Sequence, residues 1–168
     1  AGINTKVVHR SHALLERPWG AGFTYDEAML MGDSPLGAAK AAALVGGLGG
    51  LMGLAALGLA RGLLNKMLPK PGEGPSPEQQ ESGFFDFRFF GTTASGDAIT
   101  TKVTGDRDPG YGSTAKMIAE SATTLLATDR DETTGTPGGF WTPATAMGDR
   151  LIESLVEHAG LTFEVIES

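Results

Sequence analysis

A run of twenty residues without a charge, Ala41 to Ala60, constrains this chain more than any other feature. As a helix, a run of that length can cross the roughly 30 Å of hydrocarbon in a bilayer. It is built largely from alanine, glycine and leucine, and glycines recur four residues apart at Gly46 and Gly50 and at Gly49 and Gly53. Small residues at this spacing let helix backbones approach closely. The run therefore predicts a helix, or a helical hairpin, that another surface covers.

Three interpretations of the run differ in what that surface is. We favour protein cover, from the chain itself or from a second subunit, since glycine costs about 1 kcal/mol against alanine in a lone exposed helix. Contact with a membrane is the main alternative. A nucleotide-binding glycine loop is disfavoured, because Met52 replaces the last glycine of G-x-G-x-x-G and no strand precedes it. We assign an apolar helical insertion to residues 36–68 and a proline- and glycine-rich surface linker to residues 69–83.

Composition and charge narrow the class of protein. The 168 residues, 40% of them hydrophobic, suffice for one domain with a core. The absence of cysteine excludes disulfides and thiolate chemistry and fits a cytoplasmic protein, with peripheral membrane association as an alternative. Residues 1–70 carry seven basic and four acidic side chains and the remainder six and sixteen, which argues against a nucleic-acid partner. Because the chain begins without methionine, we interpret it as part of a longer protein.

The first residues, Ile3 to Tyr25, carry a weak pattern. Their first half is read as a short strand running into a helix, and the alternation around Phe23 is read as a half-buried strand. The spacing of His9, His12 and Glu16 would suit a metal on one helix face, but no second cluster completes it. A solvated helix face is favoured there, and no metal site is predicted.

The stretch "FFDFRFFGTTASGDAITTKVTG" predicts a β-hairpin that turns at residues 95–97. One face of its first strand is formed by Phe85, Phe87 and Phe89. Phe84 and Phe90 add aromatic side chains to the opposite, charged face, so we expect that face to be covered too.

Two helices and a closing strand follow the hairpin. The first helix begins near Ser113, and the second lies between a Thr142 cap and a left-handed stop at Gly160. The side chains expected to face inward are Ala115, Ile118, Ala119, Ala122, Leu125 and Leu126 in the first helix, Met147, Leu151, Ile152, Leu155 and Val156 in the second, and Leu161, Phe163 and Val165 in the strand. The predicted fold is α+β, an antiparallel sheet of hairpin plus closing strand packed with helices, without a Rossmann domain. Acidic residues in the loop between the helices, Asp129, Asp131 and Glu132, are read as solvated charge.

The corner between hairpin and helix, "GDRDPGYGSTAK", concentrates charge and special backbone. Ser113 is expected to cap the helix. Turn and capping chemistry accounts most simply for Asp106 and its neighbours, and the alternative is a surface that anchors an anion or another domain. The candidate cleft or substrate contacts are Arg107, Asp108, Tyr111 and Lys116. No catalytic residue is identified.

Several ordered segments carry a family resemblance. "VVHRSHALL", "FTYDEAM", "LPKPGEGPSPEQQESGFF", "DRDPGYGSTAKMIAESATTLLA" and "GGFWTPATAMGDRLIESLVEHAGLTFEV" resemble the carboxy-terminal part of saccharopine dehydrogenase-like oxidoreductases, the group that includes bacterial trans-acting enoyl reductases. The resemblance implies that this chain is the substrate-side and oligomerisation domain of an NAD- or NADP-dependent enzyme. It further implies a separate amino-terminal Rossmann domain for the cofactor, a small-molecule or acyl substrate, a homo-oligomer and no activity of this part alone. The alternative is a non-catalytic, membrane- or lipid-associated interaction module that shares the fold.

Overall fold

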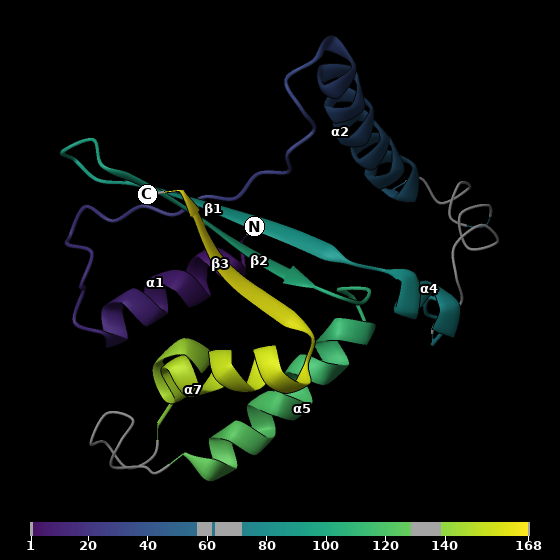
Figure 1. The fold of residues 1–168 in the computed structure, drawn as a ribbon. Coiled ribbons are helices and arrows are strands. Elements are labelled where there is room, and N and C mark those ends of the chain that lie inside the picture. Colours follow the sequence, from purple (N-terminus) through teal and green to yellow (C-terminus); the bar gives the residue numbers. More distant parts are fainter. Residues whose placement is uncertain (1, 57–61, 63–71, 129–138, 168) are drawn as a thin grey trace. The chain divides into compact units, whose positions relative to one another are not determined.

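A computed structural model describes residues 2–56, 62, 72–128 and 139–167. Within them the chain forms two compact units, residues 1–25 with 75–168, and residues 26–74. The elements, in chain order, are α1 (Asn4–Leu14), α2 (Pro35–Ala56), α4 (Pro77–Ser82), β1 (Phe85–Thr92), β2 (Ala98–Gly105), α5 (Gly112–Ala127), α7 (Pro143–His158) and β3 (Leu161–Glu167) (Figure 1). The acidic loop residues 129, 131 and 132, and residues 57–61 and 63–71 of the predicted insertion and linker, lie outside the described residues.

The larger unit is built on a three-stranded antiparallel sheet in the order β1-β2-β3. The hairpin of β1 and β2 aligns Phe85 with Gly105, and β3 adds to the other side of β2. At the turn Gly96 has a φ of 96°, which glycine adopts readily. The hydroxyls of Ser95 and then Thr93 donate to Asp97 and hold the pKa of its carboxyl below the usual range. The predicted α+β fold, with hairpin and closing strand in one antiparallel sheet, is confirmed.

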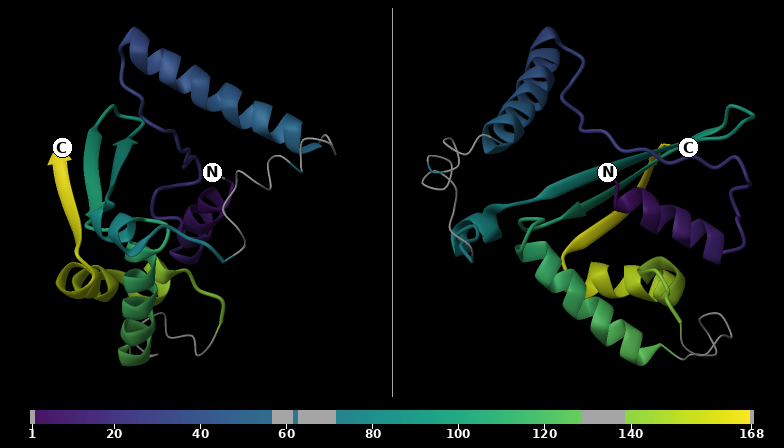
Figure 2. Two further views of the ribbon diagram at one scale, coloured as in Figure 1. Left: turned by 90° about the vertical axis from the view of Figure 1, so that its right-hand side faces the viewer. Right: turned by 180° about the vertical axis from the view of Figure 1, so that it is seen from behind.

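The hydrophobic core lies between one end of the sheet and α7. Figure 2 shows α7 beside α5 and beneath the strands in both views, and α7 packs on α5 and on β3. The core side chains are Phe85, Met147, Leu151, Leu155, Ala159 and Leu161. The inward positions predicted for Met147, Leu151, Leu155 and Leu161 are thus confirmed. The inward prediction is wrong for four other residues, all of which are exposed. Ile152 and Val156 lie on the flank of α7. Phe163 and Val165 lie farther along β3, beyond the reach of α7.

Helix α5 presents the opposite face from the predicted one. Every residue of its apolar stripe is exposed, including Ile118 at 68% and Leu126 at 89%. Buried instead are the small and polar residues Gly112, Ser113 and Thr124. The Ser154 hydroxyl of α7 donates to the Glu120 carboxylate of α5 over 2.7 Å, so polar contacts join the two helices. The corner fixes the rotation of α5, and the described residues leave its apolar stripe exposed.

The first twenty-five residues contain a helix and, in the part described, no strand. Helix α1 begins at Asn4, where the sequence predicted a strand, and it ends before Glu16 and Arg17, whose φ angles of 60° and 61° are left-handed. Phe23 packs its ring 4.8 Å from that of His12, centroid to centroid. The strand-like alternation around Phe23 therefore reflects packing of the returning chain on α1.

The segment predicted as a linker contains a helix as well. In α4 the Ser76 hydroxyl accepts the Gln79 N–H, and the Gln79 side chain accepts the Ser76 N–H. This capping box, with Pro77 at the first helical position, starts a helix that the proline content had argued against. A backbone N–H, followed by the Ser76 hydroxyl, holds the pKa of Glu78 below its usual range. The loop prediction is wrong for Pro77–Ser82.

The smaller unit contains α2, which covers the described part of the apolar run. It is the one helix among the described residues that is long and apolar enough to cross a membrane by length and composition. Gly37 packs against the carbonyl groups of Met31 and Gly32, so a side chain there would clash with the backbone. Apart from the backbone of α2 itself, no described atom lies within 4 Å of where a side chain would start at Gly46, Gly49, Gly50 or Gly53. The helical part of the 36–68 prediction is confirmed as far as Ala56, and its cover stays a prediction.

Candidate functional site

The four candidate residues come from one continuous corner between β2 and α5. Arg107 and Asp108 follow the end of β2, Tyr111 precedes α5, and Lys116 lies in its first turns. Helix α4 closes the corner from another part of the chain, because the Asp108 N–H donates to the Gln80 carbonyl over 2.9 Å. The structure therefore brings the four residues to one corner and adds α4, which the sequence did not place there.

Asp108 holds the start of α5. Its Oδ2 accepts the Tyr111 N–H at 2.7 Å and the Gly112 N–H at 3.4 Å, and its carbonyl accepts the Ser113 N–H at 2.8 Å. The Ser113 hydroxyl donates instead to the Arg107 carbonyl over 3.1 Å. The prediction that Ser113 caps the helix is wrong, since the carboxylate of Asp108 occupies that role and Ser113, fully buried, ties the turn together.

Lys116 is paired with Asp106. Its Nζ lies 2.8 Å from Oδ1 and 3.0 Å from Oδ2 of that carboxylate. The Asp106 carboxylate also rests against Gly160, where a Cβ would clash with it. A lysine in the first turns of a helix is opposed by the helix dipole, and Asp106 offsets this unfavourable position. Lys116 and Asp108 therefore have structural partners inside the chain.

Arg107 and Tyr111 are the uncommitted members of the corner. Tyr111 is 55% exposed. The stem of Arg107 packs on Gly112, where a Cβ would meet the Arg107 Cβ at 3.0 Å, and its guanidinium makes no hydrogen bond or ion pair within the described part of the chain. A guanidinium can bind a carboxylate or phosphate through paired N–H groups, and a phenol can donate a hydrogen bond to the same kind of group. These two groups are the ones this corner can offer to a ligand or another domain.

The glycines explain the special backbone around the corner. A Cβ at Gly83 would lie 2.5 Å from the Asp108 nitrogen, and one at Gly112 would lie 3.1 Å from the Gln80 carbonyl oxygen. Gly160 adopts a φ of 72° beneath Asp106. Close packing of strand, helix α4 and helix α5 at one point therefore requires these residues.

The two histidines of α1 take part in an aromatic cluster with the returning chain. His12 is 6% exposed, stacks on Trp19 with ring centroids 5.1 Å apart, and contacts the Gly20 carbonyl through Nε2 at 2.9 Å. The His9 ring meets Phe23 edge-on at 5.6 Å. Within the described residues no group of three or more His, Cys, Asp or Glu could hold a metal ion. The sequence missed this cluster, whose signal is the pair of aromatic residues seven and eleven positions after His12.

A hollow of about 300 Å³ lies elsewhere, at the start of α7. Its lining includes Leu15, Thr128 and Gly148, and Gly148 interrupts α7 with a φ of 53° and a ψ of −134°. None of the four candidate residues lines it. A second hollow, over β2 and β3, is lined by residues such as Val103 and Phe163 and likewise by none of the four. Neither hollow in the described structure therefore belongs to the corner.

Fold and corner together define an α+β domain whose described residues include an exposed apolar helix face and a charged corner. Over 92% of its length the chain is similar to a Mycobacterium tuberculosis protein that is provisionally named a trans-acting enoyl reductase, with 39% identity over 163 residues. Trans-acting enoyl reductases of Mycobacterium bovis and Mycobacterium ulcerans are 39% and 36% identical over 158 and 156 residues, or 92% and 91% of the chain.

The chain spans 37% of the length of each of these relatives. It is therefore homologous to a segment of trans-acting enoyl reductases. No protein-family model matches the chain, and no solved structure matches it.

Proposed function

We propose that this chain is the substrate-side and oligomerisation domain of an NAD- or NADP-dependent enoyl reductase. The observation that carries the proposal is the 39% identity that extends over 92% of the chain to a segment of proteins with that name. The wider saccharopine dehydrogenase-like resemblance stays a prediction. A small-molecule or acyl substrate, a homo-oligomeric state and a cytoplasmic location, free or at the membrane surface, belong to the same proposal.

The cofactor site is assigned to a different domain. The nicotinamide supplies the hydride for reduction when it is bound. The described residues do not fit a dinucleotide, because their sheet is antiparallel and the corner after β2 lacks the strand–glycine loop–helix unit of a parallel βαβ site. We therefore derive no step of hydride transfer in this chain and expect a Rossmann domain on the amino-terminal side.

This chain's contribution is assigned to the corner. Arg107 would bind a carboxylate or phosphate group of the substrate, and Tyr111 would face the interdomain cleft beside it. Asp108 and Lys116 act as positioning residues, because their side chains hold α5 and Asp106 respectively.

The binding of NADH and NADPH tests the proposal. We would compare the chain extended to its complete reading frame with residues 1–168, using calorimetry. Binding by the extended protein only is the expected result. If neither protein binds NADH or NADPH, the reductase assignment is refuted. If residues 1–168 bind NADH or NADPH without the rest of the protein, the assignment of the cofactor to another domain is refuted.

A second function is favoured by α2 alone, whose length and composition would allow it to cross a membrane. In that case the chain is a membrane- or lipid-associated module without catalysis. Flotation with phosphatidylcholine vesicles separates the two functions. The second function predicts that the protein floats with the vesicles, that flotation is lost when Leu48 and Leu51 are both replaced by lysine, and that neither NADH nor NADPH binds. That combination of results would replace the first proposal by the second.

A further inference from the structure

The outer edge of β1 has free backbone groups. β1 pairs with β2 on one side and is the edge of the described sheet on the other. The Thr93 N–H donates to the Asp97 carbonyl, and hydrogen-bonded pairs alternate along an antiparallel ladder. Odd-numbered residues of β1 therefore bond to β2, and even-numbered residues direct their N–H and C=O groups outward. Such an edge is a template for another strand.

The same edge carries exposed aromatic side chains. Phe84 and Phe90, on the charged face, are 76% and 66% exposed, and Phe87, on the opposite face, is 57% exposed. The described residues therefore do not supply the cover that the sequence predicts for the charged face. No proline interrupts residues 84–92. A proline-free, aromatic edge of this kind aggregates unless something covers it.

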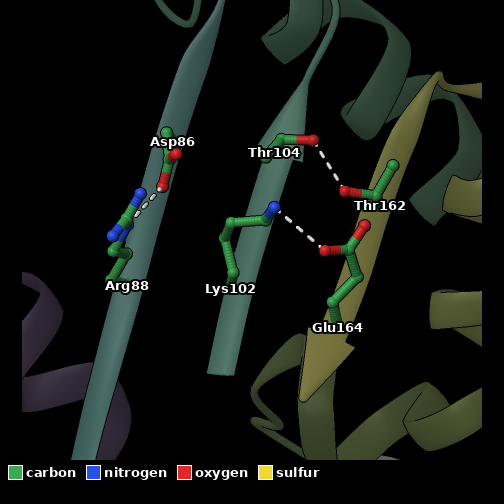
Figure 3. Close-up of polar contacts among 6 residues, drawn as sticks. All are labelled: Asp86, Arg88, Lys102, Thr104, Thr162 and Glu164. Carbon is green, nitrogen blue, oxygen red and sulfur yellow. Dashed lines mark hydrogen bonds and ion pairs between the residues drawn. The ribbon is translucent and has the colours of Figure 1, made fainter. Parts of the chain in front are cut away.

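The charges of β1 are arranged symmetrically about Phe87. Asp86 and Arg88 lie on the same face of the sheet, as Figure 3 shows, and Phe87 separates them. Within one chain they make a single contact of 3.4 Å between Arg88 Nε and Asp86 Oδ1, and their side chains are 37% and 49% exposed. Read from Phe87 in either direction, the stretch "FFDFRFF" is a palindrome except that Asp86 is balanced by Arg88. An antiparallel second copy would thus meet its own complement.

We propose that β1 pairs with β1 of a second copy of this chain, antiparallel, across a two-fold axis at Phe87. Asp86 then faces Arg88 of the second copy, and Arg88 faces its Asp86. Both are even-numbered, outward-directed positions, so each such pair can exchange two backbone hydrogen bonds. Phe84 meets Phe90 of the second copy beyond each ion pair, and two copies of Phe87 meet at the axis.

Neighbouring registers are less favourable. An axis at Arg88 would place the two arginines opposite each other, and an axis at Asp86 would do the same with the two aspartates, which is destabilising. An axis between residues would pair even with odd positions and mismatch the outward hydrogen-bonding groups. The charge pattern therefore selects Phe87 as the centre.

Charge reversal tests the pairing in the full chain. Asp86→Arg alone places arginine opposite Arg88 of the second copy at both ion pairs, and Arg88→Asp alone places acid opposite acid. We expect each change to raise the dimer dissociation constant by about tenfold or more, measured by sedimentation equilibrium. The double variant Asp86→Arg, Arg88→Asp should dimerise like the unchanged chain.

An equimolar mixture of the two single variants is the decisive sample. Each arginine then faces an aspartate, so the mixture should form heterodimers, which also shows that both variants are folded. A monomeric unchanged chain, single variants that dimerise as tightly as the unchanged chain, or a mixture that stays monomeric would each overturn the proposal.

A crosslink tests the register independently. The chain has no cysteine, so Phe87→Cys introduces a single thiol. Opposed residues of a non-hydrogen-bonded pair have Cα atoms about 4.5 Å apart, within the range for a disulfide. We expect covalent dimers on mild oxidation, at least tenfold faster than for Phe140→Cys, a control on an exposed position away from β1. Equal rates for the two variants would overturn the register.

The pairing rests on the oligomerisation part of the proposed function and gives it a surface. Its tests need no cofactor. If the complete protein dimerises through β1 but binds neither NADH nor NADPH, the pairing stands and the reductase proposal is refuted. If it binds NADH or NADPH but forms no β1 dimer, the reductase proposal stands and the pairing is refuted.

Discussion

Gly160 is the residue that connects the end of α7 to the charged corner. Its φ of 72° ends the helix, as the sequence predicts, while the absence of a side chain makes room for the Asp106 carboxylate. The first requirement is readable from a glycine after a helical pattern. The second is not, because Asp106 lies more than fifty positions earlier in the chain and meets Gly160 only in the folded sheet.

Gly160→Ala should therefore destabilise the chain through both effects. Left-handed backbone costs a residue with a Cβ roughly 1–2 kcal/mol, and the clash with Asp106 adds to it. Chemical denaturation of Gly160→Ala should show a larger loss than Gly96→Ala, where φ is 96° but no atom lies within 4 Å. In an Asp106→Ala background the extra loss should disappear, and its persistence would show that Asp106 does not rest on Gly160.

Asp108 is expected to act through the helix cap. Asp108→Ala should reduce the free energy of unfolding by about 0.5–2 kcal/mol, because two N–H groups lose their acceptor, while Asp108→Asn keeps most of the stability. Both values come from urea unfolding. Equal losses in the two variants would point to a role for the carboxylate charge and away from capping.

Asp97 should make hairpin stability depend on pH. Its pKa is lowered in the folded chain by Ser95 and Thr93, so its stabilising contribution is complete above the ordinary value of about 4 and is lost as the pH falls through the lowered pKa. The melting temperature of the unchanged chain should exceed that of Asp97→Asn at pH 6, and the difference should shrink below pH 4. A difference that grows on acidification would contradict this account.

Helix α5 shows at the scale of an element what a periodic pattern can and cannot predict. The stripe from Ala115 to Leu126 correctly indicates a helix, but the pattern does not say what the apolar face packs on. The inner face of α5 is determined by hydrogen bonds of Asp108 and Ser113 at the start of the helix and of Glu120 in its middle. We infer that the apolar stripe contributes little to the stability of residues 1–168, because it is exposed in the part of the chain that the structure describes.

This inference predicts a contrast between two leucines. Leu126→Ala should change the free energy of unfolding of residues 1–168 by no more than about 0.5 kcal/mol, because the side chain is exposed. Leu155→Ala, in the core beneath the sheet, should cost about 2–5 kcal/mol. If urea unfolding shows comparable losses of stability for the two variants, the apolar stripe of α5 faces inward, as the sequence predicts.

At the scale of the whole molecule, local patterns predict the elements better than their surroundings. The hairpin and the closing strand could be predicted because apolar side chains on one face of a strand repeat every two residues, as Phe85 and Phe87 do. Helix α7 could be predicted from its cap at Thr142 and its stop at Gly160. The pattern gave a wrong prediction before Tyr25, where the alternation around Phe23 comes from packing on His12 and not from a strand. It also gave a wrong prediction at α4, where a capping box starts a helix although the segment is rich in proline. The corner residues were placed together correctly because they are adjacent in sequence, but their partners Gln80 and Gly160 come from distant segments.

Oxidation of NADH or NADPH by the complete protein, with and without an enoyl thioester, is the measurement closest to the central claim. We predict oxidation that depends on the thioester, with a lower kcat/KM in Arg107→Ala and Tyr111→Phe. As a matched control, Arg150→Ala, a change outside the corner, should leave kcat/KM unchanged. If the complete protein binds the nucleotide but oxidises it at the same rate without the thioester, the assignment as an enoyl reductase domain is contradicted.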